Sequence, residues 1–507
     1  MLLDVAAARP DETAVDDLVR RRSWAELVDR STRVGRWLRH VVGLGPGDHA
    51  AMVMGNRAEF LELAYGALLS GTWLTPANWH LTAEELAYVI ADCGARVVVA
   101  DPAFAATVTE AAAAAGDVRV VVAGAELDAE LAAASDAPFP VDGPAGGNMF
   151  YTSGTTGRPK GVKRSVKSSV GDQLSALAAS GRLLGLDGGG PHLVTGPLYH
   201  AAPLGFAVMD QGNGAPMVVM PRFEEAATLS LIEHHRVRNT HLVPTMFVRL
   251  LRLPDDARYG FDPSSLHTVL HGAAPVSVAV KQRMIEWWGE VLVEYWGASE
   301  GGVVTLVDSA EWHSRPGTVG RAIATHEVFA ADPDGARLPP GENGTLWCRN
   351  LLVDEVFRYH NDDEKTAAAF LAPGTYTLGD IGRVDEDGYV FLADRASNMI
   401  ISGGVNIYPA EIEQVLIEHP AVADVAVFGI PDDEWGESVK AAVELVDGNE
   451  PTPELERDIL AFARERLAGY KVPRSIDVEE QLPRQPSGKL FVRVLRDRYW
   501  SGRDRRI

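Results

Sequence analysis

Apolar runs and amphipathic stretches alternate along the first part of the chain, and this alternation predicts strands and helices in turn. Residues 49–54 and 96–101 are mostly apolar over a short length, which is typical of buried strands. Residues 24–41 instead carry Leu27, Val34 and Leu38 at helical spacing. Strands and helices that follow one another in this way indicate a parallel α/β sheet.

The same reading continues to about residue 300. Strands are expected at 118–122, 148–151, 192–197, 216–220 and 239–243, and two more begin at 266 and 291 and run into small-residue turns. Helices are expected at 57–70, 82–93, 167–184, 224–235 and 276–288. Asn56 is expected to cap the helix that follows it, and residues 125–147 are expected to be a surface excursion. Several strands run into small-residue turns, which places functional backbone at the carboxyl ends of the sheet.

The pattern of apolar and turn-forming residues changes twice beyond this point. From Thr325 the strands are short and separated by Asp/Gly/Pro turns, which favours an antiparallel β subdomain. Residues 395–507 resemble a compact α+β unit, with helices at 410–419 and 453–467 and strands at 422–429 and 439–446. We interpret the arginine-rich end after Lys489 as a solvated, partly frayed terminus.

Composition and charge exclude some classes of function. A chain of 507 residues is too long for one core. The net charge of −23 argues against a general binder of nucleic acid or of anionic membranes. Cys93 and Cys348 are the two cysteines; they match no metal-ligand spacing and fit a reducing cytoplasm. We expect no signal peptide and no membrane span, because charged and turn residues interrupt the most apolar stretch, 61–79.

The most informative stretch is the loop at 151–162, Tyr-Thr-Ser-Gly-Thr-Thr-Gly-Arg-Pro-Lys-Gly-Val. Its glycines allow the backbone N–H groups to approach a ligand closely, and its hydroxyls, Arg158 and Lys160 add donors and positive charge. This is the chemistry of a loop that wraps a polyphosphate. The spacing after Gly154 does not fit the Walker loop.

Three downstream residues are weaker candidates when each is taken alone. Glu300 follows a strand on a glycine-rich turn and could hold Mg²⁺. Asp380 could accept hydrogen bonds from ribose hydroxyls, and Lys489 could reach a carboxylate and a phosphate at once. Ordinary solvated residues in turns and on the surface would give the same pattern, so the role of each of these three residues remains open when it is taken alone.

Seven motifs, in order and spread over the whole chain, resemble the adenylate-forming superfamily. This superfamily includes acyl-CoA synthetases, firefly-type luciferases and peptide-synthetase adenylation domains, and the chain is most similar to ligases that join fatty or related acids to CoA. The motifs are 151–162, 197–200, 271–275, 295–300, 376–395, 402–413 and 483–489. The resemblance implies an α/β fold with a large N-terminal domain, residues 1–393, and a small mobile α+β domain, residues 395–507, joined by a hinge at Asp394.

The resemblance also implies roles for individual residues. Contacts to ATP or to CoA are implied for Thr152, Ser153, Gly154, Thr155, Thr156, Gly157, Lys160, Gly272, Ala273, Ala274, Glu294, Tyr295, Trp296, Gly297, Ser299, Asp380, Arg395, Gly403, Gly404 and Lys489. Catalytic roles fall to Lys489, Glu300, Thr152 and His200, and the Mg²⁺ ligand is Glu300. The acyl pocket is expected to include His200, Phe206, Val243, Met246, Gly272, Trp296, Gly301 and Gly302.

Two residues depart from the pattern of the superfamily. Trp296 stands where tyrosine is common, which bears on adenine stacking and on the width of the acyl pocket. Ser397 and Asn398 stand where a lysine and an acidic residue often follow the arginine, so a phosphate or CoA contact there is in doubt.

The implied reaction has two steps and uses ATP, Mg²⁺ and CoA. A carboxylate attacks the α-phosphorus of ATP, and a thiol then displaces AMP from the acyl-adenylate. CoA is the expected acceptor, while transfer to a carrier protein or to an amino acid remains an alternative. The expected pocket is mostly apolar, which favours a fatty, cyclic or aryl acid. The expected partners are therefore small molecules, with no nucleic acid and no integral membrane association, and a homodimer is open to the chain.

Overall fold

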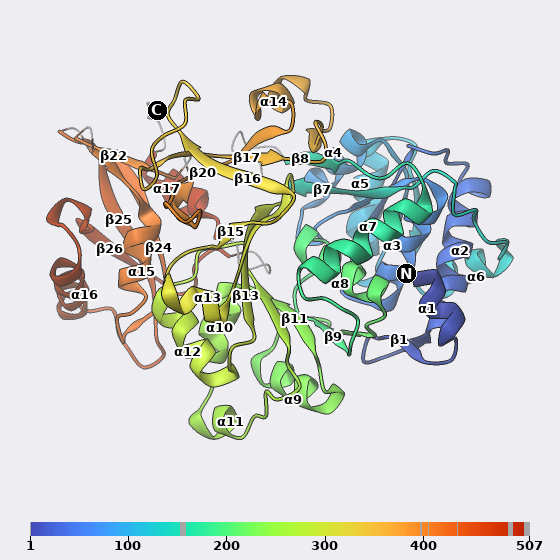
Figure 1. Cartoon of the computed structure of the whole chain (residues 1–507), viewed down its shortest axis with the longest axis horizontal. Helices are drawn as coiled ribbons and strands as arrows, with labels where there is room; N and C mark the ends of the chain where they lie inside the picture. The colour runs from blue at the N-terminus through green and yellow to red at the C-terminus, as the bar shows by residue number, and fades with distance from the viewer. Residues whose placement is uncertain are drawn as a thin grey trace.

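The computed structural model describes residues 2–152, 159–395, 398–403, 405–432, 434–484 and 490–500, and the side chain of Arg395 is not described. The strands in this part of the chain form four sheets. Figure 1 shows that the N-terminal residues, in blue and cyan, and the C-terminal residues, in orange and red, lie at opposite ends of the molecule.

The first sheet is parallel through its middle and antiparallel at its ends, because β13 turns back into β14. In spatial order its strands are β15 (Arg321–Ala322), β14 (Gly302–Asp308), β13 (Leu292–Ala298), β12 (Thr268–His271), β11 (Asn239–Leu242), β9 (His192–Val194), β10 (Met217–Val219), β1 (Thr13–Asp16) and β2 (Arg21–Ser23). The associated helices are α8 (Ala201–Asn213), α9 (Glu225–His235), α10 (Pro244–Leu250), α11 (Asp255–Tyr259), α12 (Val278–Trp288) and α13 (Ser309–Ser314).

The second sheet has the same mixed character. Its order is β18 (Phe357–Tyr359), β8 (Lys160–Arg164), β7 (Gly147–Thr152), β4 (Trp73–Pro76), β3 (His49–Val53), β5 (Ala95–Ala100) and β6 (Arg119–Val122). The helices of this part are α1 (Leu2–Ala8), α2 (Trp24–His40), α3 (Ala58–Ser70), α4 (Ala83–Cys93), α5 (Ala105–Ala115), α6 (Ala125–Ala133) and α7 (Val170–Leu183), with a 3₁₀ turn at Pro102–Phe104. The capping box predicted at Thr82 is present.

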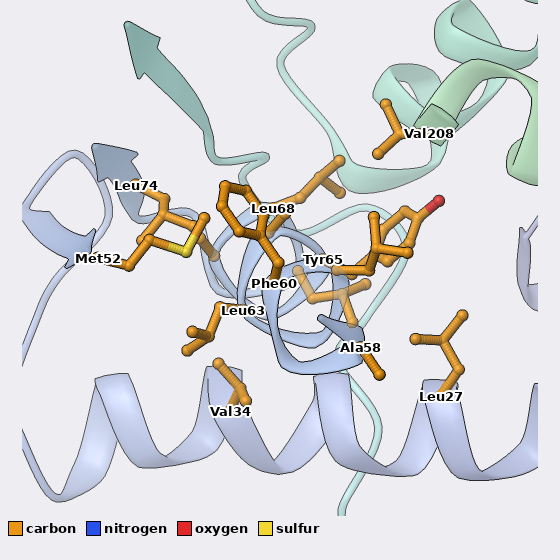
Figure 2. Close-up of a cluster of buried hydrophobic side chains, with 14 of the residues drawn as sticks. Leu27, Val34, Met52, Ala58, Phe60, Leu63, Tyr65, Leu68, Leu74 and Val208 are labelled. Atoms are coloured by element: carbon orange, nitrogen blue, oxygen red, sulfur yellow. The ribbon is translucent and has the colours of Figure 1, made fainter. Parts of the chain in front are cut away.

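The largest hydrophobic core lies around α3, and Figure 2 shows Leu27 and Val34 of α2 against its Ala58 and Leu63. Every residue of α3 is buried, which explains why the sequence is so apolar here. Glu62 is buried as well, and its carboxylate pairs with Arg22 at 2.9 Å and Arg30 at 2.7 Å. Among the residues that the structure describes, no helix combines the length and the apolar character needed to cross a membrane.

The two remaining sheets agree with the predicted antiparallel β subdomain and with the predicted α+β unit after it. The third contains β16 (His326–Ala331), β17 (Gly344–Asn350), β20 (Thr375–Val384), β19 (Phe370–Ala372) and β21 (Val390–Arg395), all antiparallel, with α14 (Asp363–Ala368) nearby. The fourth contains β23 (Val405–Ile407), β22 (Ile400–Ser402), β25 (Gly436–Leu445), β24 (Val422–Asp432) and β26 (Ser475–Glu479), with α15 (Pro409–Leu416), α16 (Pro453–Arg466), a 3₁₀ turn at Gly469–Lys471 and α17 (Val492–Trp500). The predicted α/β fold with a small C-terminal unit is confirmed.

One contact joins the C-terminal sheet to the rest of the chain at a defined point. The guanidinium of Arg252, just after α10, donates to the carbonyl oxygens of Val422 and Ala423 at the start of β24. Figure 1 shows this C-terminal part beside α10, α12 and α13.

Two local expectations are wrong at the N-terminal side. The residue that precedes α3 is Arg57, which makes no side-chain cap, whereas the Asn56 amide donates to Gly196 and Met220 carbonyls at 2.9 Å. Asn56 therefore joins distant loops instead of capping a helix. Part of the segment 125–147 is the helix α6, because Leu127 and Leu131, four residues apart, are both buried on its inner face.

The strand expected from residue 291 is β13, which runs to Ala298 because residues 293–298 pair with β14. One expectation fails further along the chain. The arginine-rich end is helical and packed as far as Trp500, whose indole N–H donates to the Gly429 carbonyl at 3.0 Å, while Leu495 is 1% exposed. The interpretation of this segment as frayed is wrong up to that residue.

A carboxyl group beside the C-terminal core gives a prediction of stability against pH. Desolvation raises the pKa of Glu413 on α15 to about 8, although the Val427 N–H donates to its Oε1 at 2.8 Å and favours the ionised form. The unfolded carboxyl has its ordinary pKa of 4.5, so the folded chain holds the extra proton between these values and stability falls as pH rises from 4.5 to 8.

Glu413→Gln is expected to stabilise the fold at pH 8 by about 2 kcal/mol and to remove most of this slope. Calorimetric unfolding at pH 5 and pH 8 measures the effect. Glu418→Gln, at an exposed position just after α15, is the control and is expected to leave the slope intact. An unchanged slope in Glu413→Gln would contradict the raised pKa.

Candidate active site

Two long-range hydrogen bonds mark the place where three of the sheets meet. Trp296 on β13 donates its indole N–H to Oδ2 of Asp380 on β20 over 2.8 Å. Tyr359 on β18 donates its hydroxyl to Oε1 of Glu300, in the turn between β13 and β14, over 3.1 Å. Glu300, Trp296 and Asp380 come from separate motifs, and the fold brings them into one region.

The turn between β13 and β14 requires glycine for reasons of space. A Cβ on Gly297 would lie 1.9 Å from the Gly302 carbonyl oxygen, and one on Gly301 would lie 2.5 Å from the Tyr376 hydroxyl. Gly302 also has a φ of +72°, in the left-handed region that favours glycine. The small residues therefore allow the hairpin that carries Ser299 and Glu300 to pack against β20.

The two described ends of the segment 151–162 lie side by side in the sheet that carries Tyr359. Its first strand ends at Thr152, which pairs directly with Lys160 at the start of β8. Lys160 Nζ lies 2.8 Å from Asp362 Oδ2, and this hydrogen bond holds the pKa of the lysine above its ordinary value. The predicted phosphate contacts of Ser153, Gly154, Thr155, Thr156 and Gly157 fall outside the described residues.

Glu300 is the candidate magnesium ligand. Among the described residues its carboxylate has one hydrogen-bond partner, the Tyr359 hydroxyl, which donates to Oε1 and leaves lone pairs on both oxygens. Within the described part of the chain no three acidic, histidine or cysteine side chains gather as a metal cage. A single carboxylate next to a phosphate loop nevertheless suits Mg²⁺, which is usually held by one or two carboxylates together with substrate phosphates.

The predicted acyl-pocket residues are divided among three hydrophobic clusters. Phe206 on α8 packs against His241 and Tyr295, with ring centroids 5.1 Å away in both cases. Val243 and Met246, at the start of α10, lie in a second cluster, and Trp296 lies in a third. His200 immediately precedes α8, its ring centroid 4.4 Å from that of Tyr199. The side chains around Phe206 are thus mostly apolar.

The segment 272–274 directly follows β12 and lies close to β13. A Cβ on Gly272 would come within 2.5 Å of the Tyr295 carbonyl oxygen, and Ala273 has a φ of +66°. Glu294 does not fit its expected contact with a cofactor. It is 5% exposed, and its Oε2 lies 2.6 Å from Lys281 Nζ, so a buried ion pair occupies the carboxylate.

The C-terminal candidates are described only in part. Asp394, the expected hinge, accepts the Ala410 N–H at 2.9 Å and so ties β21 to the first turn of α15. Arg395 pairs with Asp380 across β21 and β20 through the backbone. Gly403 has a φ of +58° and lies against Trp435. Lys489 and Gly404 lie outside the described residues.

Sequence reasoning assigned no role to three polar side chains at this junction: Tyr359, Tyr376 and Arg164. Tyr359 supports Glu300, while Tyr376 and Arg164 lie against the glycines that follow Glu300. Two of them have a sequence signal, since Tyr376 opens the motif 376–395 and Arg164 alternates with Lys160 and Val162 along β8 and so shares their face. Tyr359 and Tyr376 lie on strands about 200 residues after the segment 151–162 in the sequence.

Comparison with known proteins shows the family to which the chain is similar. Residues 2–354 match the model of the AMP-binding enzyme family, and residues 411–489 match the model of the AMP-binding enzyme C-terminal domain.

Several proteins of known name are similar to the chain over nearly its whole length. A feruloyl-CoA synthase from Amycolatopsis is 36% identical, with 97% of both chains covered. The long-chain-fatty-acid–CoA ligase FadD13 of Mycobacterium tuberculosis is 35% identical over 90% of this chain and 89% of the relative. The structure of o-succinylbenzoate CoA synthetase from Bacillus subtilis, solved with an acyl-adenylate, superposes with a TM-score of 0.83 at 27% identity, covering 100% of this chain and 99% of the other.

Proposed function

The chain belongs to the family of AMP-binding enzymes, and we propose that it is an ATP-dependent carboxylic acid:CoA ligase. It activates an acid as the acyl-adenylate, with release of pyrophosphate, and then forms the acyl-CoA thioester, with release of AMP. The resemblance read from the seven motifs is confirmed by the family match. The observation that carries the proposal is the convergence of Glu300, Trp296 and Asp380 at the junction of three sheets.

The first step needs groups that stabilise charge on the transferring phosphoryl group. A carboxylate oxygen attacks the α-phosphorus of ATP, and pyrophosphate leaves. The loop that starts at Thr152, Lys160 and Lys489 would hold the phosphates, Ser299 would donate beside the α-phosphate, and Asp380 would bind the ribose. Glu300 would hold Mg²⁺, which supplies charge neutralisation on the phosphates.

The second step uses the C-terminal domain in a different orientation. We place the boundary between residues 1–393 and 395–507, with Asp394 as the hinge. Rotation about this residue would withdraw Lys489 and present Gly403 and Gly404 to the acyl carbon, where glycine leaves room for a pantetheine thiol. The bond from Ala410 N–H to Asp394 supports this assignment, since it fixes the hinge residue to the domain that turns.

The acyl group comes from an apolar acid, fatty, cyclic or aryl. The rings of Phe206, His241 and Tyr295 support this class, because they form an apolar wall beside the β12–β13 edge. The relatives act on feruloyl and long-chain acyl groups, which belong to the same class.

One pair of assays tests the function. Pyrophosphate release is measured over a panel of carboxylic acids, and AMP release is then followed for the best acid with CoA, a carrier protein or an amino acid as the acceptor. CoA is expected to give the fastest AMP release. Release that depends on the carrier protein or on the amine would replace CoA as the acceptor.

Two wider properties complete the proposal. We place the enzyme in the cytoplasm, because Cys93 and Cys348 are both buried free thiols. We also propose a homodimer, which light scattering of the purified protein tests directly.

The bond between Trp296 and Asp380 gives a prediction for nucleotide binding. Trp296→Phe keeps the ring but removes the N–H that orients the carboxylate, so the KM for ATP is expected to rise about fivefold to tenfold with kcat little changed. The rise is expected to be smaller for 2′-deoxy-ATP, because part of the lost interaction acts through a ribose hydroxyl. Trp287→Phe removes an indole N–H that bonds the Arg258 carbonyl at 2.9 Å, away from the site, and is the matched control. Equal rises for both nucleotides would rule out an effect through Asp380.

A further inference from the structure

Arg164, at the end of β8, points into the junction of the three sheets. Arg164 pairs with Phe357 on β18, and Val162, two residues earlier on β8, pairs with Tyr359. These four side chains therefore lie on the same face of the sheet. A Cβ on Gly302 would lie 2.7 Å from its Nη2, which puts the guanidinium against the hairpin that bears Glu300. The guanidinium therefore lies on the same side of the sheet as the candidate active site.

This guanidinium has an unusual environment. Its charge helps to lower the pKa of His326 to about 4, after the larger effect of burial of that ring, and desolvation lowers its own pKa. The side chain of Arg164 is nevertheless exposed to solvent. Within the described ranges the structure gives its side chain no hydrogen bond and no ion pair, whereas Lys160 on the same face has Asp362.

A second donor stands beside it. Tyr376 on β20 is 0% exposed, and its hydroxyl is buried without a hydrogen-bond partner among the described residues. The hydroxyl lies 2.5 Å from where a Cβ of Gly301 would be, next to the glycine that Arg164 contacts. Val162 and Phe357 belong to the same hydrophobic cluster as Tyr376. A buried hydroxyl without a partner has a free-energy cost that a bound acceptor would remove.

The position of this corner sets it apart from the phosphate end of β8. Arg164 is four residues along β8 from Lys160, which is about 13 Å in a regular strand, whereas Tyr376 and Asp380 lie on a part of β20 that a bulge shortens. Lys160 and Asp380 are the residues that we assign to the phosphates and the ribose. The corner lies instead against Gly301 and Gly302, which follow Glu300, on the side expected for the acyl group.

We propose that Arg164 and Tyr376 form an anion-binding subsite for a second acidic group at the far end of the acid. The proposal rests on the proposed function and narrows its substrate class, from apolar monoacids to acids with an apolar body and a distal carboxylate. The guanidinium supplies a charged fork and Tyr376 an additional O–H donor, which together suit a carboxylate.

The test compares matched acids and matched variants. Each pair of acids has the same length and differs only in a terminal methyl or a terminal carboxylate, and kcat/KM is measured by pyrophosphate release. The wild-type enzyme is expected to prefer one or more diacids at least tenfold over the matched monoacid. Arg164→Gln is expected to lower kcat/KM for that diacid at least tenfold and for the monoacid less than threefold. Tyr376→Phe, which keeps the buried ring, is expected to lower it severalfold for the diacid alone.

The control variant is Lys163→Gln. Lys163 is the neighbour of Arg164 on the opposite face of β8, where its Nζ lies 3.0 Å from His49 Nε2. The substitution therefore removes a positive charge outside the junction. It is expected to leave the preference for the diacid unchanged.

The other outcomes overturn the assignment in distinguishable ways. Equal losses on both acids in Arg164→Gln would mean that the residue serves the nucleotide or the fold. A rise in the KM for CoA alone, with adenylation of all acids unchanged, would mean that the anion belongs to CoA. No pyrophosphate release with any acid in the wild-type enzyme would overturn the proposed function itself, and the subsite with it.

Discussion

Replacement of Lys489 by alanine is expected to lower the rate of acyl-adenylate formation by about a hundredfold or more. The lysine is the positive charge that we assign to the attacking carboxylate and the α-phosphate, where charge develops in the transition state. Thioester formation from a supplied acyl-adenylate is expected to stay within about threefold of wild type, because the proposed domain rotation removes this lysine before the thiol attacks. The two half-reactions are measured separately, as pyrophosphate release and as AMP release from the adenylate.

The control for this variant lies in the same domain. Lys471 pairs with Glu411 at 2.6 Å on the side of α15, and Lys471→Ala is expected to change neither half-reaction by more than about threefold. Equal losses in both half-reactions for Lys489→Ala would show that the lysine is not specific to adenylation, and the proposed rotation would lose its main support.

Removal of the charge on Glu300 is expected to have an effect of similar size. Glu300→Gln keeps the shape and the acceptor for the Tyr359 hydroxyl but removes the negative charge that we assign to Mg²⁺. The kcat for adenylation is expected to fall about a hundredfold, and the Mg²⁺ concentration for half-maximal activity is expected to rise at least about tenfold. Titration of activity with Mg²⁺ at saturating ATP measures both.

Two further variants show whether the effect is local. Glu290→Gln removes a charge from an exposed residue just before β13 and is expected to have no effect on the titration. Tyr359→Phe removes only the hydrogen bond to Oε1 and is expected to lower kcat by about threefold to tenfold. A Glu300→Gln enzyme with an unchanged Mg²⁺ requirement would exclude the carboxylate as the ligand.

The local elements of the fold were largely predictable from sequence. The capping box at Thr82 is present, and the predicted strands β3, β5 and β12 occur within a few residues of their expected positions. These features depend on neighbours in the sequence, since capping and periodicity act within a few residues. The predictions failed where distant contacts decided the outcome, as at Asn56, which bonds loops 140 and 164 residues away.

The site divides along the same line. The loop at 151–162 predicts a phosphate site from its own residues, because hydroxyls, glycines and a lysine in a short segment are typical of one. The ion pair between Glu294 and Lys281 could not be predicted from the sequence, since it depends on how α12 packs against β13. The bond between Trp296 and Asp380, 84 residues apart, likewise has no local signal.

The sequence alone therefore determined the fold class and the family, and it predicts phosphate chemistry for the loop at 151–162, because each depends on short-range spacing and residue type. The tertiary structure alone decided which polar groups are paired. It gave Lys160 and Glu294 partners in Asp362 and Lys281, and it placed Arg164 and Tyr376 beside Gly301 and Gly302. The physical reason is that pairing and desolvation depend on residues from separate helices, strands and loops, which only the packing of these elements brings within reach.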